Sequence, residues 1–262
     1  MKRFAKIILF TGVVVSLSLS SFALSVNLIG SGAEVPGESF AERLSSGASI
    51  LLQQNRGNQN SASSNEVIST STIDPTDWNL LLVNPNHSVP DDCHPVLAQV
   101  QGSYEMDERV APYMKEMIDA AKKDGINLWV LSTYRTYEYQ QKLFDTNVKQ
   151  LKSQGMTEEE AVQETAANVA VPGTSEHQTG LAADIMCSEW TGGITDDFAE
   201  TPAYEWLHAH CAEYGFIERY PKDKTEITGI VYEPWHYRFV GKEHAETIMS
   251  RGITLEEYLG VR

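Results

Sequence analysis

The pattern of apolar and polar positions predicts helices and a buried strand in the middle of the chain. Apolar residues recur with a helical period over residues 105–121, and this pattern ends at Gly125. The run NLWVLSTY, residues 127–134, is short and rich in residues that favour strands, which indicates a buried strand. Two further helices are predicted over residues 137–154 and 157–170.

The second half of the chain continues this mixture. LAADIMC, residues 181–187, and GIVYEPWHYRFVG, residues 229–241, are predicted strands, and Pro234 interrupts the second. The apolar run over residues 80–83, closed by Asn-Pro, is also typical of a strand. Further helices are predicted over residues 202–214, 243–249 and 255–259. Because strands and helices do not alternate in βαβ order, the predicted class is α+β.

The N-terminal part of the chain predicts export and a linker. Residues 1–30 begin with basic residues and continue with apolar or small ones, as an export signal does. This segment is either a cleaved signal peptide or a retained membrane anchor, because it is long for a signal and has no clear A-x-A site. Residues 31–73 are rich in Ser, Asn and Gln, which is typical of a disordered linker. We therefore expect residues 74–262 to fold as one domain outside the cytoplasm.

Charge and cysteine content exclude two kinds of function. The formal net charge is −16, so no nucleic-acid partner is expected, because phosphate binding needs a basic surface. Cys93, Cys187 and Cys211 lack C-x-x-C spacing, which excludes a cysteine-rich zinc knuckle. In an oxidising compartment they could form one disulfide and leave one thiol free, and their spacing does not select the pair.

The segment SEHQTGLAADI, residues 175–185, contains candidate metal ligands. Strand alternation places Leu181 and Ile185 on one face and Asp184 on the other. A buried, unpaired aspartate is costly, so Asp184 needs a cation or a strong donor, and His177 in the preceding turn could share that cation. Zinc accepts imidazole nitrogen and carboxylate oxygen, and a catalytic zinc site has three protein ligands and an open position.

EPWHYR, residues 233–238, supplies the third candidate ligand, His236. Pro234 disfavours a helix here, and a bend at this residue would let Glu233 approach the water on a metal and act as a general base. Taken alone, the segment also fits an edge strand with an exposed glutamate and a packed His–Trp pair. Its combination with His177 and Asp184 favours the metal site.

Two motifs together resemble the VanY-type D-alanyl-D-alanine carboxypeptidases, which belong to a group of zinc peptidases that share the hedgehog-like fold. These motifs are S-x-H-x-x-G-x-A-x-D from Ser175 and E-x-W-H-x-R from Glu233. The segments LLVNPNHSVP and STYRTYEYQ are similar to two further family segments and occur in the expected order. The resemblance covers residues 78–241 and implies a small antiparallel sheet with flanking helices.

The resemblance also implies a role for each matching residue. It gives the zinc ligands His177, Asp184 and His236, the catalytic base Glu233, the cation Arg135 that supports the substrate and the developing oxyanion, and the polar substrate contacts Gln140 and Ser175. The chain departs from the usual family pattern at Thr136 and Pro234, and neither residue is a ligand.

The leading hypothesis is a monomeric, zinc-dependent carboxypeptidase that removes the C-terminal D-alanine from peptidoglycan stem peptides, at the extracellular face of the membrane or in the cell wall. An L,D-carboxypeptidase or an endopeptidase would use the same zinc residues. A non-catalytic zinc-containing wall-binding domain could lose Glu233 or Arg135 at no cost, whereas this chain has both. Donors such as Arg135 and Gln140 favour a carboxypeptidase, because they pair with a free carboxylate and would be left unsatisfied by a continuing chain.

Overall fold

The described part of this computed structural model comprises Asp74 and residues 77–261. The predicted signal or anchor and the predicted linker lie outside the described residues. Within 77–261, no helix combines the length and the apolar character that crossing a membrane requires.

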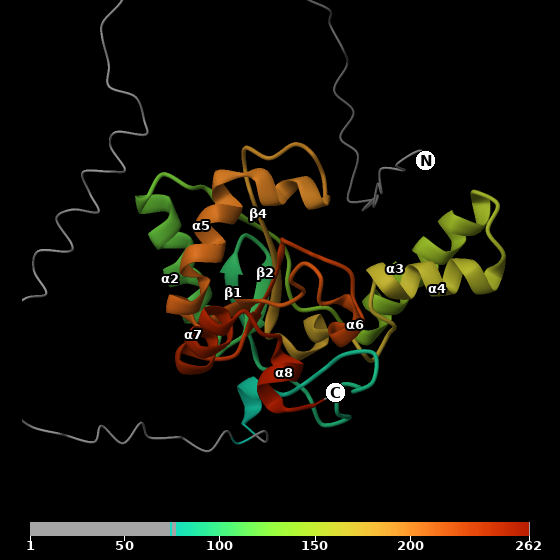
Figure 1. The fold of residues 1–262 in the computed structure, drawn as a ribbon, viewed down its shortest axis with the longest axis horizontal. Helices are drawn as coiled ribbons and strands as arrows, with labels where there is room; N and C mark the ends of the chain where they lie inside the picture. Colours follow the sequence, from blue (N-terminus) through green and yellow to red (C-terminus); the bar gives the residue numbers. More distant parts are fainter. Residues whose placement is uncertain (1–73, 75–76, 262) are drawn as a thin grey trace, which may run out of the picture. The chain divides into compact units, whose positions relative to one another are not determined.

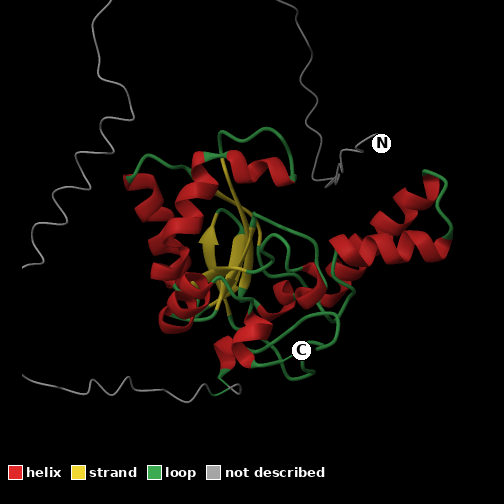
Figure 2. Ribbon diagram, viewed as in Figure 1, coloured by secondary structure: helices red, strands yellow, loops and turns green. Residues whose placement is uncertain are grey.

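Two antiparallel sheets lie at the centre of this region (Figures 1 and 2). One is a hairpin of β1 (Leu97–Gln101) and β2 (Tyr104–Asp107). The other has the order β3-β4-β6-β5 and consists of β3 (Leu128–Ser132), β4 (Ala182–Cys187), β6 (His236–Phe239) and β5 (Phe216–Glu218). All neighbouring strands are antiparallel, which confirms the predicted α+β class and its small antiparallel sheet.

Helices flank the sheets. They are α2 (Ala111–Lys123), α3 (Tyr137–Ser153), α4 (Glu158–Asn168), α5 (Pro202–His210), α6 (Thr225–Thr228), α7 (Lys242–Arg251) and α8 (Leu255–Leu259), with the short 3-10 helices η1 (Trp78–Leu80), η2 (Glu176–Thr179), η3 (Asp196–Glu200) and η4 (Cys211–Tyr214). In Figure 1, α2, α5 and α7 lie on one side of the sheets, and the hairpin of α3 and α4 extends from the other side. A capping box of Thr157 and Glu160 starts α4, because each side chain bonds the backbone N–H of the other.

The main core lies on one face of the four-stranded sheet. The predicted alternation along β4 is confirmed, since Leu181, Ala183 and Ile185 belong to this core and are at most 2% exposed. Side chains of α2 and α5 cover them. Asp184 therefore faces the opposite side of the sheet, where the candidate site lies.

Several predicted elements differ in extent because pairing with distant segments decides them. The helix predicted over 105–121 begins only at Ala111, since residues Glu105 to Asp107 pair with β1 instead. The strand predicted over 80–83 is absent: η1 ends at Leu80, and only an isolated bridge joins Asn84 to His87. The strand predicted over 229–241 is confined to β6.

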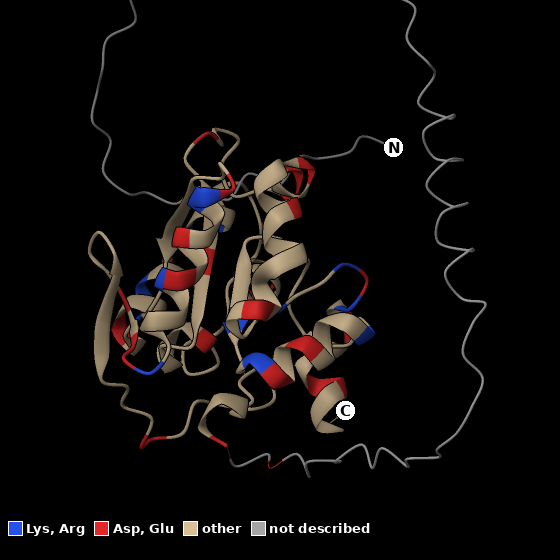
Figure 3. Ribbon diagram, turned by 90° about the vertical axis from the view of Figure 1, so that its left-hand side faces the viewer, with Lys and Arg blue, Asp and Glu red and all other residues tan. Residues whose placement is uncertain are grey.

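Basic and acidic positions are interspersed (Figure 3), and the three cysteines are unpaired. Basic positions are scattered among acidic ones along the helices visible in Figure 3. Cys93, Cys187 and Cys211 are all free thiols, so the structure contains no disulfide between them. Burial raises the pKa of the Cys211 thiol, and this cysteine packs in the main core as an apolar side chain.

Candidate active site

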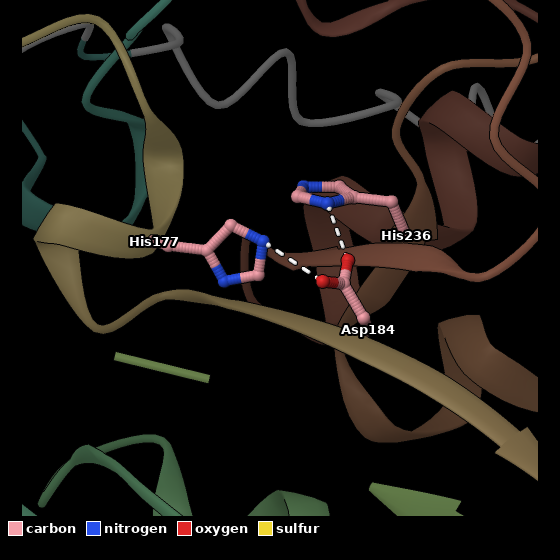
Figure 4. A group of neighbouring side chains, drawn as sticks. All are labelled: His177, Asp184 and His236. Atoms are coloured by element: carbon pink, nitrogen blue, oxygen red, sulfur yellow. Dashed lines mark hydrogen bonds and ion pairs between the residues drawn. The ribbon is translucent and has the colours of Figure 1, made fainter. Parts of the chain in front are cut away.

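Three segments bring His177, Asp184 and His236 together (Figure 4). Asp184 on β4 pairs in register with His236 on β6, so the two side chains leave the same face of the sheet. His177 comes from η2, immediately before β4. One ligand atom from each residue lies within 4.8 Å of the others, and all three residues are buried. The predicted ligands therefore form one cluster.

Hydrogen bonds leave one nitrogen of each imidazole facing the Asp184 carboxylate. His177 Nε2 lies 3.3 Å from Asp184 Oδ2, and its Nδ1 lies 2.7 Å from the Thr133 carbonyl oxygen. His236 Nδ1 lies 3.0 Å from Asp184 Oδ1, and its Nε2 lies 3.4 Å from a carboxylate oxygen of Glu176. Metal-binding histidines commonly donate their second N–H to a carbonyl or carboxylate in this way. The donor set of two imidazoles and one carboxylate fits Zn²⁺.

The electrostatics of the cluster also suit a cation. Burial lowers the pKa of His177 to about 4, so this imidazole is neutral. Burial opposes ionisation of Asp184, but its interactions with His177, His236 and Arg135 outweigh burial and hold the pKa of Asp184 well below its usual range. Burial also disfavours protonated His236, yet hydrogen bonds to Asp184 and Glu176 raise its pKa to about 9. A divalent cation can take the place of the proton that charges His236 and can satisfy the same side chains.

Glu233 lies beside this cluster because the chain turns at Pro234 and Trp235. The turn is closed by the His236 backbone N–H, which donates to the Glu233 carbonyl oxygen at 3.1 Å. The Glu233 carboxylate is 3.8 Å from His236 Nδ1, and burial raises the pKa of Glu233 to about 8. The predicted bend is thus present, and a carboxylate with such a pKa is suited to accept and return a proton.

Arg135 approaches the cluster from the loop between β3 and α3. Its Nη2 lies 2.7 Å from Asp184 Oδ2, and its Nε donates to Ser132 Oγ at 2.9 Å. Gln140 supports it, with Oε1 at 3.3 Å from Arg135 Nη1 and Nε2 donating to the Ala170 carbonyl oxygen at 2.8 Å. The guanidinium is therefore fixed in direction before any substrate binds.

A cavity borders these groups. His177, Asp184, His236, Glu233, Arg135 and Ser175 all line it. Gln140 does not line the cavity and is fully buried behind Arg135. Two of the predicted substrate contacts, Ser175 and Arg135, thus line the cavity, and the third, Gln140, contacts Arg135.

Sequence reasoning missed the residues that surround the ligands. Glu176 lies between Ser175 and His177 in the chain and is 1% exposed, and it contacts Arg219 and Arg238. Strand alternation could have placed Arg238 on the face of His236, two residues away. No local signal indicates Arg219.

Comparisons with known proteins agree with this geometry. The family model described as VanY, D-alanyl-D-alanine carboxypeptidase, matches residues 103–242. A D-alanyl-D-alanine carboxypeptidase of Enterococcus faecalis is 45% identical over 186 residues, which are 71% of this chain and 67% of that protein. A crystal structure of a vancomycin resistance D,D-pentapeptidase VanY variant with Zn(II) has a TM-score of 0.64 and 43% identity and covers 70% of this chain and 99% of its own. VanYB in complex with D-alanine-D-alanine has a TM-score of 0.65 and 44% identity and covers 70% of this chain and 98% of its own.

Proposed function

The chain belongs to the VanY family of D-alanyl-D-alanine carboxypeptidases, and from this premise we propose that it removes the C-terminal D-alanine from peptidoglycan stem peptides. It is a zinc metallocarboxypeptidase. The observation that carries the proposal is the cluster of His177, Asp184 and His236 with Glu233 and Arg135 at one cavity. A wall-binding domain without catalysis would have no need of the last two residues in this position.

Each residue of the site has its own role in the proposed reaction. His177, Asp184 and His236 would hold Zn²⁺, which would supply a Lewis acid for a water molecule and for the scissile carbonyl. Glu233 accepts a proton from the attacking water and returns it to the leaving amine, for which its raised pKa is suited. Arg135 places a fixed positive charge where the carbonyl oxygen becomes anionic.

Recognition of the substrate terminus favours a carboxypeptidase over an endopeptidase. Arg135 and Ser175 line the cavity and offer a guanidinium and a hydroxyl. A free carboxylate satisfies such donors, whereas a continuing peptide chain would leave them unpaired. An L,D-carboxypeptidase would use the same residues, so the stereochemistry of the preceding residue is set by the remainder of the cavity.

The sequence also supports a proposal for the location of the domain. Residues 1–30 support export, with the domain at the extracellular face of the membrane or in the cell wall, and either a cleaved signal or a retained anchor agrees with this placement. Residues 31–73 would then separate the domain from the membrane. We propose a monomer, because the described residues of a single chain already supply the three ligands, Glu233 and Arg135.

The test is hydrolysis of a purified pentapeptide muropeptide, followed by mass spectrometry. The wild-type protein should release one D-alanine, and a chelator should stop the reaction until Zn²⁺ is restored. Glu233→Gln should retain stoichiometric zinc and lose at least about a hundredfold in kcat, the lower end of the effect of general acid–base catalysis. Release of no D-alanine by the zinc-loaded wild-type protein would refute the proposed function, and loss of zinc from Glu233→Gln would refute the role of Glu233 as base.

A further inference from the structure

Four charged side chains form a buried network beside the candidate metal site. They are Glu176 of η2, Arg219 after β5, Arg238 of β6 and Glu256 of α8, and none is more than 2% exposed. Their charges cancel as two cations and two anions. Burial of four charges is costly unless every one is paired. The location of this network beside the candidate metal site therefore requires an explanation.

The two oxygens of Glu176 have different partners. Oε1 accepts from Arg219 Nε and from Arg238 Nη1, both at 2.7 Å. Oε2 lies 3.4 Å from His236 Nε2. Both arginines therefore bind the same oxygen, Oε1, and the other oxygen, Oε2, faces the His236 imidazole.

The arginines are themselves held by distant parts of the chain. Arg219 donates to both carboxylate oxygens of Glu256, at 2.7 and 2.9 Å. Glu256 also accepts from Asn84 Nδ2 at 3.0 Å. Arg238 Nη2 donates to the Leu81 carbonyl oxygen at 2.7 Å. Glu176 is thus fixed by the C-terminal helix and by the segment that precedes β1.

We infer that Glu176 is a positioning residue for the metal site, which holds a proton on His236 Nε2 and so presents Nδ1 as the ligand atom. This inference rests on the proposed zinc site. The carboxylate orients the ring and increases the basicity of its free nitrogen, as carboxylates behind metal-binding histidines do. The arginines hold Glu176 through Oε1 and so prevent its side chain from turning toward the metal as a fourth ligand, which would close the open coordination position.

The experiment compares Glu176→Gln with Glu256→Gln in the full chain. Both substitutions remove one carboxylate charge and one partner of Arg219, but only Glu176 contacts His236. Zinc affinity is measured by competition with a chromophoric chelator, and the visible absorption of the cobalt-substituted protein reports ligand geometry. We expect Glu176→Gln to weaken zinc binding by about 10- to 100-fold and to alter the visible absorption spectrum of the cobalt-substituted protein. Glu256→Gln should lower thermal stability and leave zinc affinity within about twofold, since the contact between Glu176 and His236 remains.

The outcomes separate this inference from the proposed function. Equal loss of zinc affinity in both variants would show a purely structural network and overturn the inference, as would unchanged affinity in Glu176→Gln. If Glu176→Gln does not fold, Glu176→Asp decides, because it keeps the charge for the arginines and withdraws the oxygen from His236. Unaltered zinc affinity in Glu176→Asp would likewise overturn the inference. A wild-type protein that binds no zinc would instead refute the proposed zinc site.

Discussion

Gly180 is the motif position at which the structure gives the sharpest prediction about stability. It ends η2 with φ 72°, a left-handed conformation that favours glycine. Its carbonyl oxygen accepts from the Asp107 backbone N–H at 3.0 Å, which joins the start of β4 to the end of β2. A Cβ at Gly180 would lie 2.9 Å from the Asp107 backbone nitrogen and 3.3 Å from Pro95 Cβ. The substitution Gly180→Ala therefore creates both backbone strain and a collision.

The size of each effect can be separated with a second glycine. The left-handed conformation costs a residue with a Cβ about 1–2 kcal/mol. Overpacking against neighbours that cannot move typically costs a further 1–3 kcal/mol or so, and here the nearest neighbour is backbone. Gly125, after α2, has φ 83° and no atom within 4 Å of its added Cβ. Gly125→Ala should thus lose about 1–2 kcal/mol, and Gly180→Ala about 2–5 kcal/mol.

Urea unfolding of the two variants and the wild type measures the difference. The midpoint should fall further for Gly180→Ala, with an unchanged dependence on urea concentration. Since η2 also carries His177, we expect this variant to bind zinc more weakly than Gly125→Ala does. Equal losses of stability in both variants would show that the approach of Gly180 to Asp107 is not a tight contact and would refute the reasoning.

Two further predictions concern substrate recognition and pH. A stem peptide with a C-terminal amide should be cut at least about tenfold more slowly than the same peptide with a free C-terminal acid. This ratio corresponds to about 1.4 kcal/mol of lost charge-assisted recognition by Arg135 and Ser175. Equal rates on the two peptides would favour an endopeptidase. The hydrogen bond from His208 to Glu218 at 2.9 Å raises the pKa of His208 above its ordinary value of 6.5. The charged pair therefore stabilises the fold fully below pH 6.5, and this stabilisation is lost as the pH rises through the raised pKa. Because the His208 side chain is 56% exposed, His208→Asn should lower the free energy of unfolding by at most about 1 kcal/mol, and only below pH 6.5. Urea unfolding measures this effect on both sides of the raised pKa. An equal effect above the raised pKa would exclude a charged pair.

The sequence by itself determined the groups that carry the chemistry and most of the elements that present them. Strand alternation around Asp184 placed it opposite the core, and the proline after Glu233 indicated the bend that directs this residue to the site. Helices α3 and α4 also agree with the helices predicted over residues 137–154 and 157–170. These features depend on residues close together in the chain, which is why local patterns reveal them.

Only the tertiary structure decided how the groups are held. The hairpin of β1 and β2 replaced the first turns of a predicted helix, because strand pairing outweighs helical periodicity where a partner is available. Gln140 proved to support Arg135 from behind, a placement set by the Ala170 carbonyl 30 residues away. The contact between Glu176 and His236 joins residues 60 positions apart, and Arg219 and Glu256 complete it from other elements. Side chains so distant in sequence meet only through the packing of the sheet and its helices, and no local propensity encodes that packing.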